Sequence, residues 1–220
     1  MSNHTDSLAD QGAALRLASA GRLPEQVAAT FEAEREAMIG RGVPDRTAAP
    51  GTAMPDGELL DVHGEPTTLT AARAGRPAVV VFYRGAWCPY CNLTLRHYQA
   101  TLVAELEARG IVLVAVSPQT PDGSLSVAEK NELTFTVLSD PGNRIADRLG
   151  LTFTPGADAR AAQQRLGVDL ADLNADGTAV LPLTTAVLVD AAGTIRWIDV
   201  RPDYTSRSES AEILAAADAL

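Results

Sequence analysis

Cysteine is scarce in this chain of 220 residues, since Cys88 and Cys91 are its only two thiols. Long apolar runs are also missing, because no segment approaches the roughly 20 residues that a membrane-spanning helix needs. The first residues carry Asp6 and Asp10, and Arg16 interrupts their short apolar stretch, so we expect no signal-peptide core there. These absences predict a cytoplasmic protein with no membrane partner. In that compartment a close cysteine pair is more often catalytic or metal-binding than a structural crosslink.

Basic residues are also few, with 18 lysines and arginines against 28 aspartates and glutamates. The formal net charge is −10 at pH 7 and the isoelectric point is about 4.7, so the overall field repels phosphate backbones and anionic lipids. We therefore expect no nucleic-acid partner. A closed zinc site needs four nitrogen or sulfur ligands, and the three histidines His4, His63 and His97 are isolated from one another. No P-loop and no GxGxxG motif is present either, and we expect neither a metal nor an organic cofactor.

The apolar pattern predicts an α/β fold. Continuous apolar runs at 78–83 and 111–116 are typical of strands buried on both faces, and residues 89–107 show helical spacing between them. Further strands are expected at 59–62, 135–138, 186–190 and 194–200, and further helices near 127–131, at 143–149, near 159–166 and at 209–220. Together these elements predict a mixed, mostly parallel central sheet with helices on both faces.

The N-terminal part has a different character. Residues 23–39 place Val27, Phe31 and Met38 at helical spacing, with charges on the other side, and a Pro- and Gly-rich linker follows. We predict a helical extension over residues 1–45, docked on the main domain or on a second subunit, and one domain over residues 46–220. Residues 152–180 are less regular and are interpreted as an insertion.

The two cysteines stand at the predicted start of a helix. Cys88 fits the N-cap position and Pro89 the first helical position, where proline needs no hydrogen-bond acceptor. An N-cap thiolate can accept hydrogen bonds from the next backbone amides and lies at the positive end of the helix dipole. We therefore expect a depressed pKa for this thiol, within the range of about 3.5 to 7.5 known for such cysteines. Cys91, one turn on, can reach Cys88 for a disulfide while lying deeper in the fold.

Other interpretations of these residues stay open. The pair could be a buried structural feature, since cysteine is among the most buried residue types. Arg84 is either an ordinary solvated arginine or a residue that stabilises the thiolate and a peroxide oxygen. Trp87 would shield the site and offer an apolar contact to a substrate. His97 lies on another side of the helix from Cys91 and is interpreted as a surface histidine.

The stretch FYRGAWCPYCNLTLR resembles the peroxiredoxin-like branch of the alkyl hydroperoxide reductase and thiol-specific antioxidant family, and CPYC is also the active-site tetrad of glutaredoxins. Three further segments carry the same resemblance: GTAMPDGELLDVHGEPTTL, LSDPGNRIADRLG and AVLVDAAGTIRWIDVRPDYTSR. The resemblance runs from about residue 30 to the C-terminus and implies a thioredoxin-like fold.

On the peroxiredoxin pattern, Arg84, Cys88 and Cys91 stand where the family has proline, threonine and the peroxidatic cysteine. The resemblance thus implies that Cys91 meets the peroxide and that Cys88 is a local resolving partner. Thr184 and Thr185 stand where peroxiredoxins carry an arginine and thioredoxins a cis-proline, and they are candidate substrate-binding residues together with Trp87.

The leading functional hypothesis is a thiol-dependent peroxidase that acts on hydrogen peroxide or alkyl hydroperoxides and is reduced by a thioredoxin- or glutaredoxin-type partner. The first alternative is a thiol–disulfide oxidoreductase, in which Cys88 attacks a substrate disulfide and Cys91 resolves it. The second is a non-enzymatic redox-sensing module whose partner affinity follows the disulfide state. A homodimer is a further expectation that the residues do not decide.

Overall fold

The computed structural model describes residues 7–220. Its α-helices are α1 (Leu8–Ala20), α2 (Glu25–Arg41), α3 (Leu69–Arg73), α4 (Pro89–Thr101), α5 (Val103–Ala108), α6 (Pro121–Lys130), α7 (Arg144–Arg148), α8 (Ala157–Arg165), α9 (Leu170–Leu173) and α10 (Ser210–Ala217), with a 3-10 turn η1 (Pro141–Asn143). Its strands are β1 (Glu58–Leu60), β2 (Pro66–Thr68), β3 (Ala78–Phe82), β4 (Val112–Ser117), β5 (Thr136–Ser139), β6 (Thr152–Phe153), β7 (Leu181–Pro182), β8 (Thr184–Val189) and β9 (Ile195–Arg201). Residues 1–6, which include His4 and Asp6, lie outside the described part of the chain.

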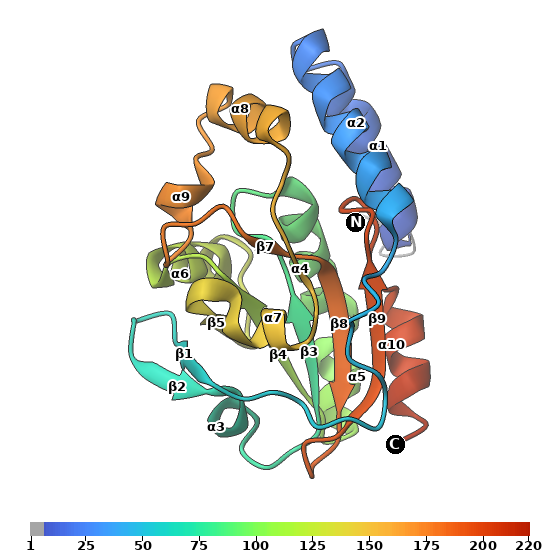
Figure 1. The fold of residues 1–220 in the computed structure, drawn as a ribbon. Helices are drawn as coiled ribbons and strands as arrows, with labels where there is room; N and C mark the ends of the chain where they lie inside the picture. The colour runs from blue at the N-terminus through green and yellow to red at the C-terminus, as the bar shows by residue number, and fades with distance from the viewer. Residues whose placement is uncertain (1–6) are drawn as a thin grey trace.

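Seven strands form the central sheet in the order β2-β1-β5-β4-β3-β8-β9, with helices on both faces (Figure 1). The mixed α/β architecture is therefore confirmed. Parallel pairing is limited to β3 with β4 and β4 with β5, whereas the other neighbours pair antiparallel. The parallel share is smaller than expected, because β8 and β9 form a hairpin on one side and β1 folds back as a hairpin with β2 on the other.

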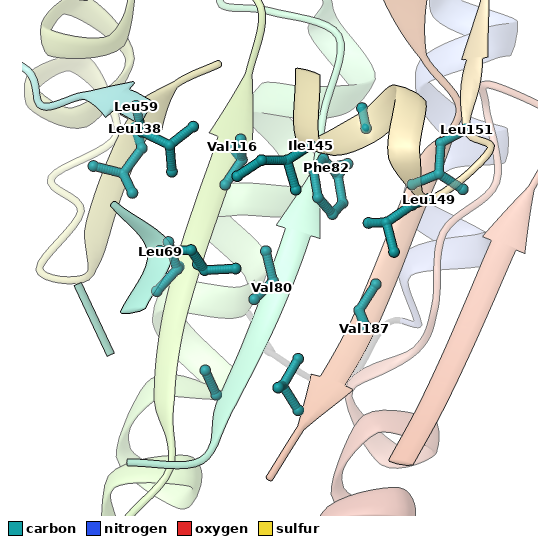
Figure 2. Packing of buried hydrophobic residues seen from close by; sticks show 14 of the residues in the cluster. Leu59, Leu69, Val80, Phe82, Val116, Leu138, Ile145, Leu149, Leu151 and Val187 are labelled. Atoms are coloured by element: carbon teal, nitrogen blue, oxygen red, sulfur yellow. The ribbon is translucent and has the colours of Figure 1, made fainter. Parts of the chain in front are cut away.

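Strand β3 lies at the centre and is buried along its whole length. Because side chains alternate across a strand, Val80 and Phe82 pack on one face and Val79 and Val81 on the other. The first face carries Ile145 of α7 and other apolar residues (Figure 2). The second face is covered by α4, α5 and α10. Because both faces of this strand are covered, every one of its residues is apolar and the sequence shows no alternation.

The two N-terminal helices lie beside each other at one edge of the molecule (Figure 1). Helix α2 matches the predicted helix and buries Val27 and Met38, while α1 was not expected. α2 contacts α8, and α1 contacts α4. An ion pair between Arg35 and Asp203, with N···O at 2.7 Å, also ties α2 to the segment after β9. The extension thus docks on its own chain, and the proposed boundary at residue 45 stays a prediction.

Residues 152–180 contain β6, α8 and α9, and β6 pairs antiparallel with β7 apart from the main sheet. Their interpretation as an insertion stays a prediction. No helix among the described residues is long and apolar enough to cross a membrane.

Candidate active site

Both cysteines lie where β3 leads into α4. Cys88 is the N-cap of α4 and Pro89 its first residue, as expected. The carbonyl of Cys88 accepts from the backbone N–H groups of Cys91 and Asn92, each at 3.1 Å, which begins the helix. One turn of helix therefore separates the two thiols, and both are free.

Neither sulfur is presented to solvent, although the position of Cys88 at the helix end predicts an exposed thiol. Cys88 is 1% exposed and Cys91 0% exposed. They belong to an apolar cluster between the sheet and α4, and the side chains of Trp87 and Tyr90 pack against that cluster. The rings of Trp87 and Tyr90 thus cover the N-terminal end of the helix, and the shielding expected of Trp87 is present.

The expected N-cap activation of Cys88 is also wrong. Its side chain makes no capping hydrogen bond to the helix. Burial raises the pKa of Cys88 well above its ordinary value, a hydrogen bond to Cys91 and the negative charge there raise it further, and the charges of Arg84 and Arg207 oppose this only in part. The surroundings of Cys88 therefore favour its neutral form.

The pKa of Cys91 shifts in the opposite direction. Burial alone would raise its pKa, but the hydrogen bond from Cys88, the charges of Arg207 and Arg84, and the backbone N–H of Arg84 outweigh burial and hold the pKa well below its ordinary value. Hydrogen bonds to the charged form and nearby opposite charges are the general causes of such a shift. The surroundings of the two buried thiols thus shift their pKa values in opposite directions.

Arg207 is a site residue that sequence reasoning missed. Its Nη2 atom donates to Cys91 Sγ at 3.3 Å. Its Nη1 atom donates to the carbonyls of Tyr204 and Ser206, each at 2.6 Å, and these bonds fix the guanidinium. Arg207 follows β9 and lies 116 positions from Cys91 in the chain. It falls within the last of the segments that carry the family resemblance, but nothing in its local sequence marks it.

Arg84 is not a solvated arginine, since only 7% of it is exposed. Its guanidinium carbon lies 4.7 Å from the ring centre of Trp87 and 4.6 Å from that of Tyr204. Its Nε atom is buried and has no hydrogen-bond partner, and the same holds for Nε1 of Trp87. Arg84 therefore lies between two aromatic rings, and its Nε–H group has no hydrogen-bond acceptor.

The loop between β3 and α4 is held by side-chain amides. Gln119 accepts from the backbone N–H of Ala86 at 2.7 Å and donates to the hydroxyl of Tyr83 at 2.9 Å. Asn92 donates to the carbonyl of Ala86 at 2.7 Å and accepts from Asn131 at 3.0 Å. Both backbone groups of Ala86 are thus satisfied inside the protein, which fixes the loop that leads to Cys88.

Thr184 and Thr185 are buried at the start of β8, and their hydroxyls donate to the carbonyls of Arg201 and Leu183 at 3.2 and 3.0 Å. With Arg207 they line a cavity of about 10 Å³. That volume is near the lower limit for one water molecule, about 10–15 Å³. Their role in substrate binding stays a prediction.

Two of the histidines, His63 and His97, lie in the described part of the chain. His63 is exposed in a turn, and His97 is half-buried, with its ring 3.1 Å from the side-chain amide of Gln11. Within residues 7–220, no group of three or more His, Cys, Asp or Glu side chains is arranged to hold a metal ion.

The chain is similar to a known protein family and to several proteins of known name. A family model described as the AhpC/TSA family matches residues 50–198. The chain is 31% identical over 101 residues to a putative peroxiredoxin bcp of Haemophilus influenzae and 30% identical over 101 residues to peroxiredoxin Bcp of Escherichia coli. Each alignment covers 46% of this chain and 64% of the relative, so the match spans less than two thirds of these relatives.

Solved structures are similar over a larger part of the chain. Reduced Prx3 of Vibrio vulnificus, in complex with H2O2, superposes with a TM-score of 0.63 at 20% identity and covers 78% of this chain and 99% of its own. Peroxidoxin BcpB of Mycobacterium tuberculosis gives a TM-score of 0.58 at 20% identity and covers 78% and 97%. These structures share the thioredoxin-like fold that was expected. Since the family model covers well over half of its residues, the chain belongs to the AhpC/TSA family.

Proposed function

We propose that this protein is a thiol-dependent peroxidase in which Cys91 reacts with the peroxide and Cys88 resolves the product. The observation that carries the proposal is the hydrogen bond from Arg207 Nη2 to Cys91 Sγ at 3.3 Å, made inside a buried pair of thiols. Burial raises the pKa of Cys88, whereas at Cys91 hydrogen bonds and the charges of Arg207 and Arg84 outweigh burial and lower the pKa. Only the thiolate is nucleophilic, so Cys91 is the sulfur prepared for attack.

In the first step, Cys91 Sγ attacks the outer oxygen of the peroxide. The S–O bond forms as the O–O bond breaks, the sulfur is oxidised to a sulfenic acid, and the peroxide is reduced to an alcohol or water. The leaving oxygen needs one proton, and the thiol of Cys88 is a donor already hydrogen-bonded to the reacting sulfur. Arg207 and Arg84 stabilise the negative charge before and during the transfer.

In the second step, the sulfur of Cys88 attacks the sulfenic acid. An S–S bond forms, the S–O bond breaks, and hydroxide leaves and is protonated to water. The two cysteines are three residues apart at the start of one helix, which allows a local disulfide. An external dithiol, of the thioredoxin or glutaredoxin type in our proposal, then reduces this disulfide and is itself oxidised to a disulfide. It returns two electrons and one proton to the pair, and its second proton neutralises the released hydroxide. The proposed cycle uses no metal or organic cofactor.

The thiol–disulfide oxidoreductase alternative requires Cys88 to be the attacking thiolate. The raised pKa of Cys88 disfavours its thiolate form, and an exposure of only 1% limits its access to a protein disulfide. A protein disulfide must also come into line with the attacking sulfur, whereas hydrogen peroxide is small enough to enter a nearly closed site.

The test is consumption of hydrogen peroxide by the reduced protein with a thioredoxin system, followed by non-reducing electrophoresis and mass mapping. We expect turnover and an intramolecular Cys88–Cys91 disulfide, because the chain has no third cysteine. The Cys88→Ser/Cys91→Ser double variant is the control. A dominant covalent dimer, or redox-dependent partner capture without peroxide turnover, would contradict the proposal.

A further inference from the structure

The part of the chain that carries Arg207 is neither helix nor strand. It runs over residues 203–209, between β9 and α10, and we call it the arginine segment. Within it the backbone N–H of Ser206 donates to the carbonyl of Asp203 at 2.9 Å. Fixing a backbone in one conformation costs entropy, so a segment without a helix or a strand depends on contacts from the rest of the chain.

Helix α2 holds the first end of the arginine segment. Nη1 of Arg35 donates to Oδ2 of Asp203 at 2.7 Å, and the hydroxyl of Tyr204 donates to the carbonyl of Phe31 at 3.3 Å. The guanidinium of Arg35 also donates to Glu32, one turn earlier on the same helix. The side chains of Arg35 and Asp203 are only 15% and 24% exposed, so water and salt screen this ion pair less than an exposed one.

Helix α1 holds the other end. The backbone N–H groups of Leu8 and Ala9, in the first turn of α1, donate to the carboxylate of Glu209 at 3.0 and 2.8 Å. These N–H groups have no acceptor within the helix, so the carboxylate satisfies them. α1 also passes so close that a Cβ atom on Gly12 would lie 3.2 Å from the carbonyl oxygen of Thr205. Figure 1 shows both helices, in blue, beside the red segment that follows β9.

Arg207 lies between these two ends and reaches the reactive pair. Its Nη1 atom donates to the carbonyls of Tyr204 and Ser206, and its Nη2 atom donates to Cys91 Sγ. The position of the guanidinium therefore depends on the backbone of the arginine segment. Since the Tyr204 hydroxyl bonds to α2 and the Tyr204 carbonyl to Arg207, contacts with the N-terminal helices continue to Cys91.

Other charged and titratable groups also face Cys91. Cys88 stands at the N-cap of α4, and Tyr83 and Arg84 follow β3. Burial raises the pKa of Tyr83, so its hydroxyl keeps its proton. Arg84 and Arg207 are the two cations that lower the pKa of Cys91, and only Arg207 belongs to the arginine segment.

We propose that helices α1 and α2 position Arg207 for Cys91, with Arg35 as a positioning residue that acts through Asp203. This inference deepens the function proposed above and rests on it, because Cys91 is the sulfur proposed to attack the peroxide. The helices and the arginine segment both lie outside residues 50–198, which the family model matches. The reactivity of Cys91 is thus tied to contacts that lie outside the matched part of the chain.

Positioning and simple electrostatics predict opposite results for Asp203→Asn. The change removes a negative charge near Arg207, which by itself would favour the Cys91 thiolate and lower its titration midpoint. It also removes the carboxylate partner of Arg35, while the amide oxygen can still accept from Thr205. The proposal therefore predicts a higher midpoint. The thiolate fraction below that midpoint should fall at least about twofold, the lower end for residues coupled in one hydrogen-bond network.

The titrations use the Cys88→Ser protein, so the thiolate absorbance comes from Cys91 alone. Arg35→Met should also raise the midpoint, and Arg35→Lys, which can keep the ion pair, should restore most of it. Arg41→Met is the matched control. Arg41 lies on the same helix, is 59% exposed and pairs with Glu34 at 3.8 Å, so its replacement should leave the midpoint unchanged.

The same changes in the Arg207→Met protein test the route of the effect. If Arg35 and Asp203 act through Arg207, most of the rise should disappear in this background. An unchanged midpoint in both Arg35→Met and Asp203→Asn, a lower midpoint in Asp203→Asn, or equal rises with and without Arg207 would overturn the inference. Unfolding in urea verifies that each variant is folded, and the isosteric Asp203→Asn carries the test if Arg35→Met does not fold.

These titrations need no peroxide, so the two proposals can fail separately. The expected midpoints, in a protein that consumes no hydrogen peroxide, would support the positioning of Arg207 and contradict the peroxidase function alone. Turnover of hydrogen peroxide by the wild type, with midpoints that do not respond to Arg35 and Asp203, would refute the positioning alone.

Discussion

Replacement of Arg207 by methionine removes the guanidinium that donates to Cys91 Sγ at 3.3 Å. In an effective dielectric constant of about 20, two unit charges at this distance attract by about 5 kcal/mol, which is an upper bound for a half-buried arginine. A hydrogen bond to a charged group contributes about 1.5–3 kcal/mol. At about 1.4 kcal/mol for each factor of ten, the thiolate fraction below the titration midpoint should fall roughly tenfold to a hundredfold.

The assay follows the ultraviolet absorbance of the thiolate against pH in the wild type and in Arg207→Met. We expect a higher midpoint and a slower reaction with peroxide at pH values below that midpoint. Arg207→Lys keeps the charge and should fall between the two. Arg196→Met removes an exposed arginine that pairs with Asp190, and it should leave the midpoint unchanged. Equal midpoints in the wild type and in Arg207→Met would refute the reasoning.

The same change has a consequence for stability. The pKa of Cys91 is lower in the folded than in the unfolded protein, so its thiolate stabilises the fold fully above the unfolded value of about 8.5. That contribution is lost as the pH falls through the lowered folded value. Arg207→Met should therefore destabilise the protein more at mildly alkaline than at acidic pH, measured by denaturant unfolding under reducing conditions.

Three further changes test how the site is held. Gly85→Ala puts a Cβ atom 2.5 Å from Nε1 of Trp87 at a φ of +146°, so unfolding in urea should show a loss of more than about 1 kcal/mol. Gln119→Leu removes hydrogen bonds that hold the loop before Cys88, and we expect about 1–3 kcal/mol lower stability with slower peroxide oxidation. Tyr98→Phe removes a buried bond of 2.6 Å to the carbonyl of Ser208, so stability should fall by a similar amount and the thiolate midpoint should rise as the Arg207 segment loosens. Unchanged stability in any of the three would contradict the contact concerned.

The local part of the site could be predicted because its causes are local. Pro89 at the first helical position and an apolar run before it define a strand, a turn and a helix start, and the structure has all three. The sequence patterns likewise located the hairpin of β8 and β9 and the helix α2. The sequence pattern does not predict helix α1, because its apolar residues do not form a clear stripe. This helix is stabilised by tertiary contacts, such as those of Leu8 in the core.

The electrostatics could not be predicted from local sequence. The N-cap position of Cys88 predicts a lowered pKa. Cys88 is only 1% exposed, and its burial raises the pKa by more than the helix end lowers it. The charge that favours the thiolate of Cys91 comes from Arg207, which the chain brings back after β9. No periodicity or spacing connects residues 116 positions apart, so this contact required the tertiary fold. The resemblance to peroxiredoxins implies the peroxidatic role for Cys91, and this role stays a prediction.

The most direct test of the central claim locates the first oxidised sulfur. Reduced Cys88→Ser protein is treated with stoichiometric hydrogen peroxide in the presence of a sulfenic-acid trap, and the labelled peptide is identified by mass spectrometry. The account predicts rapid labelling at Cys91 and loss of reductant-driven turnover, because the internal disulfide cannot close. An unlabelled Cys91 in this variant, together with rapid labelling of Cys88 in the Cys91→Ser protein, would contradict it.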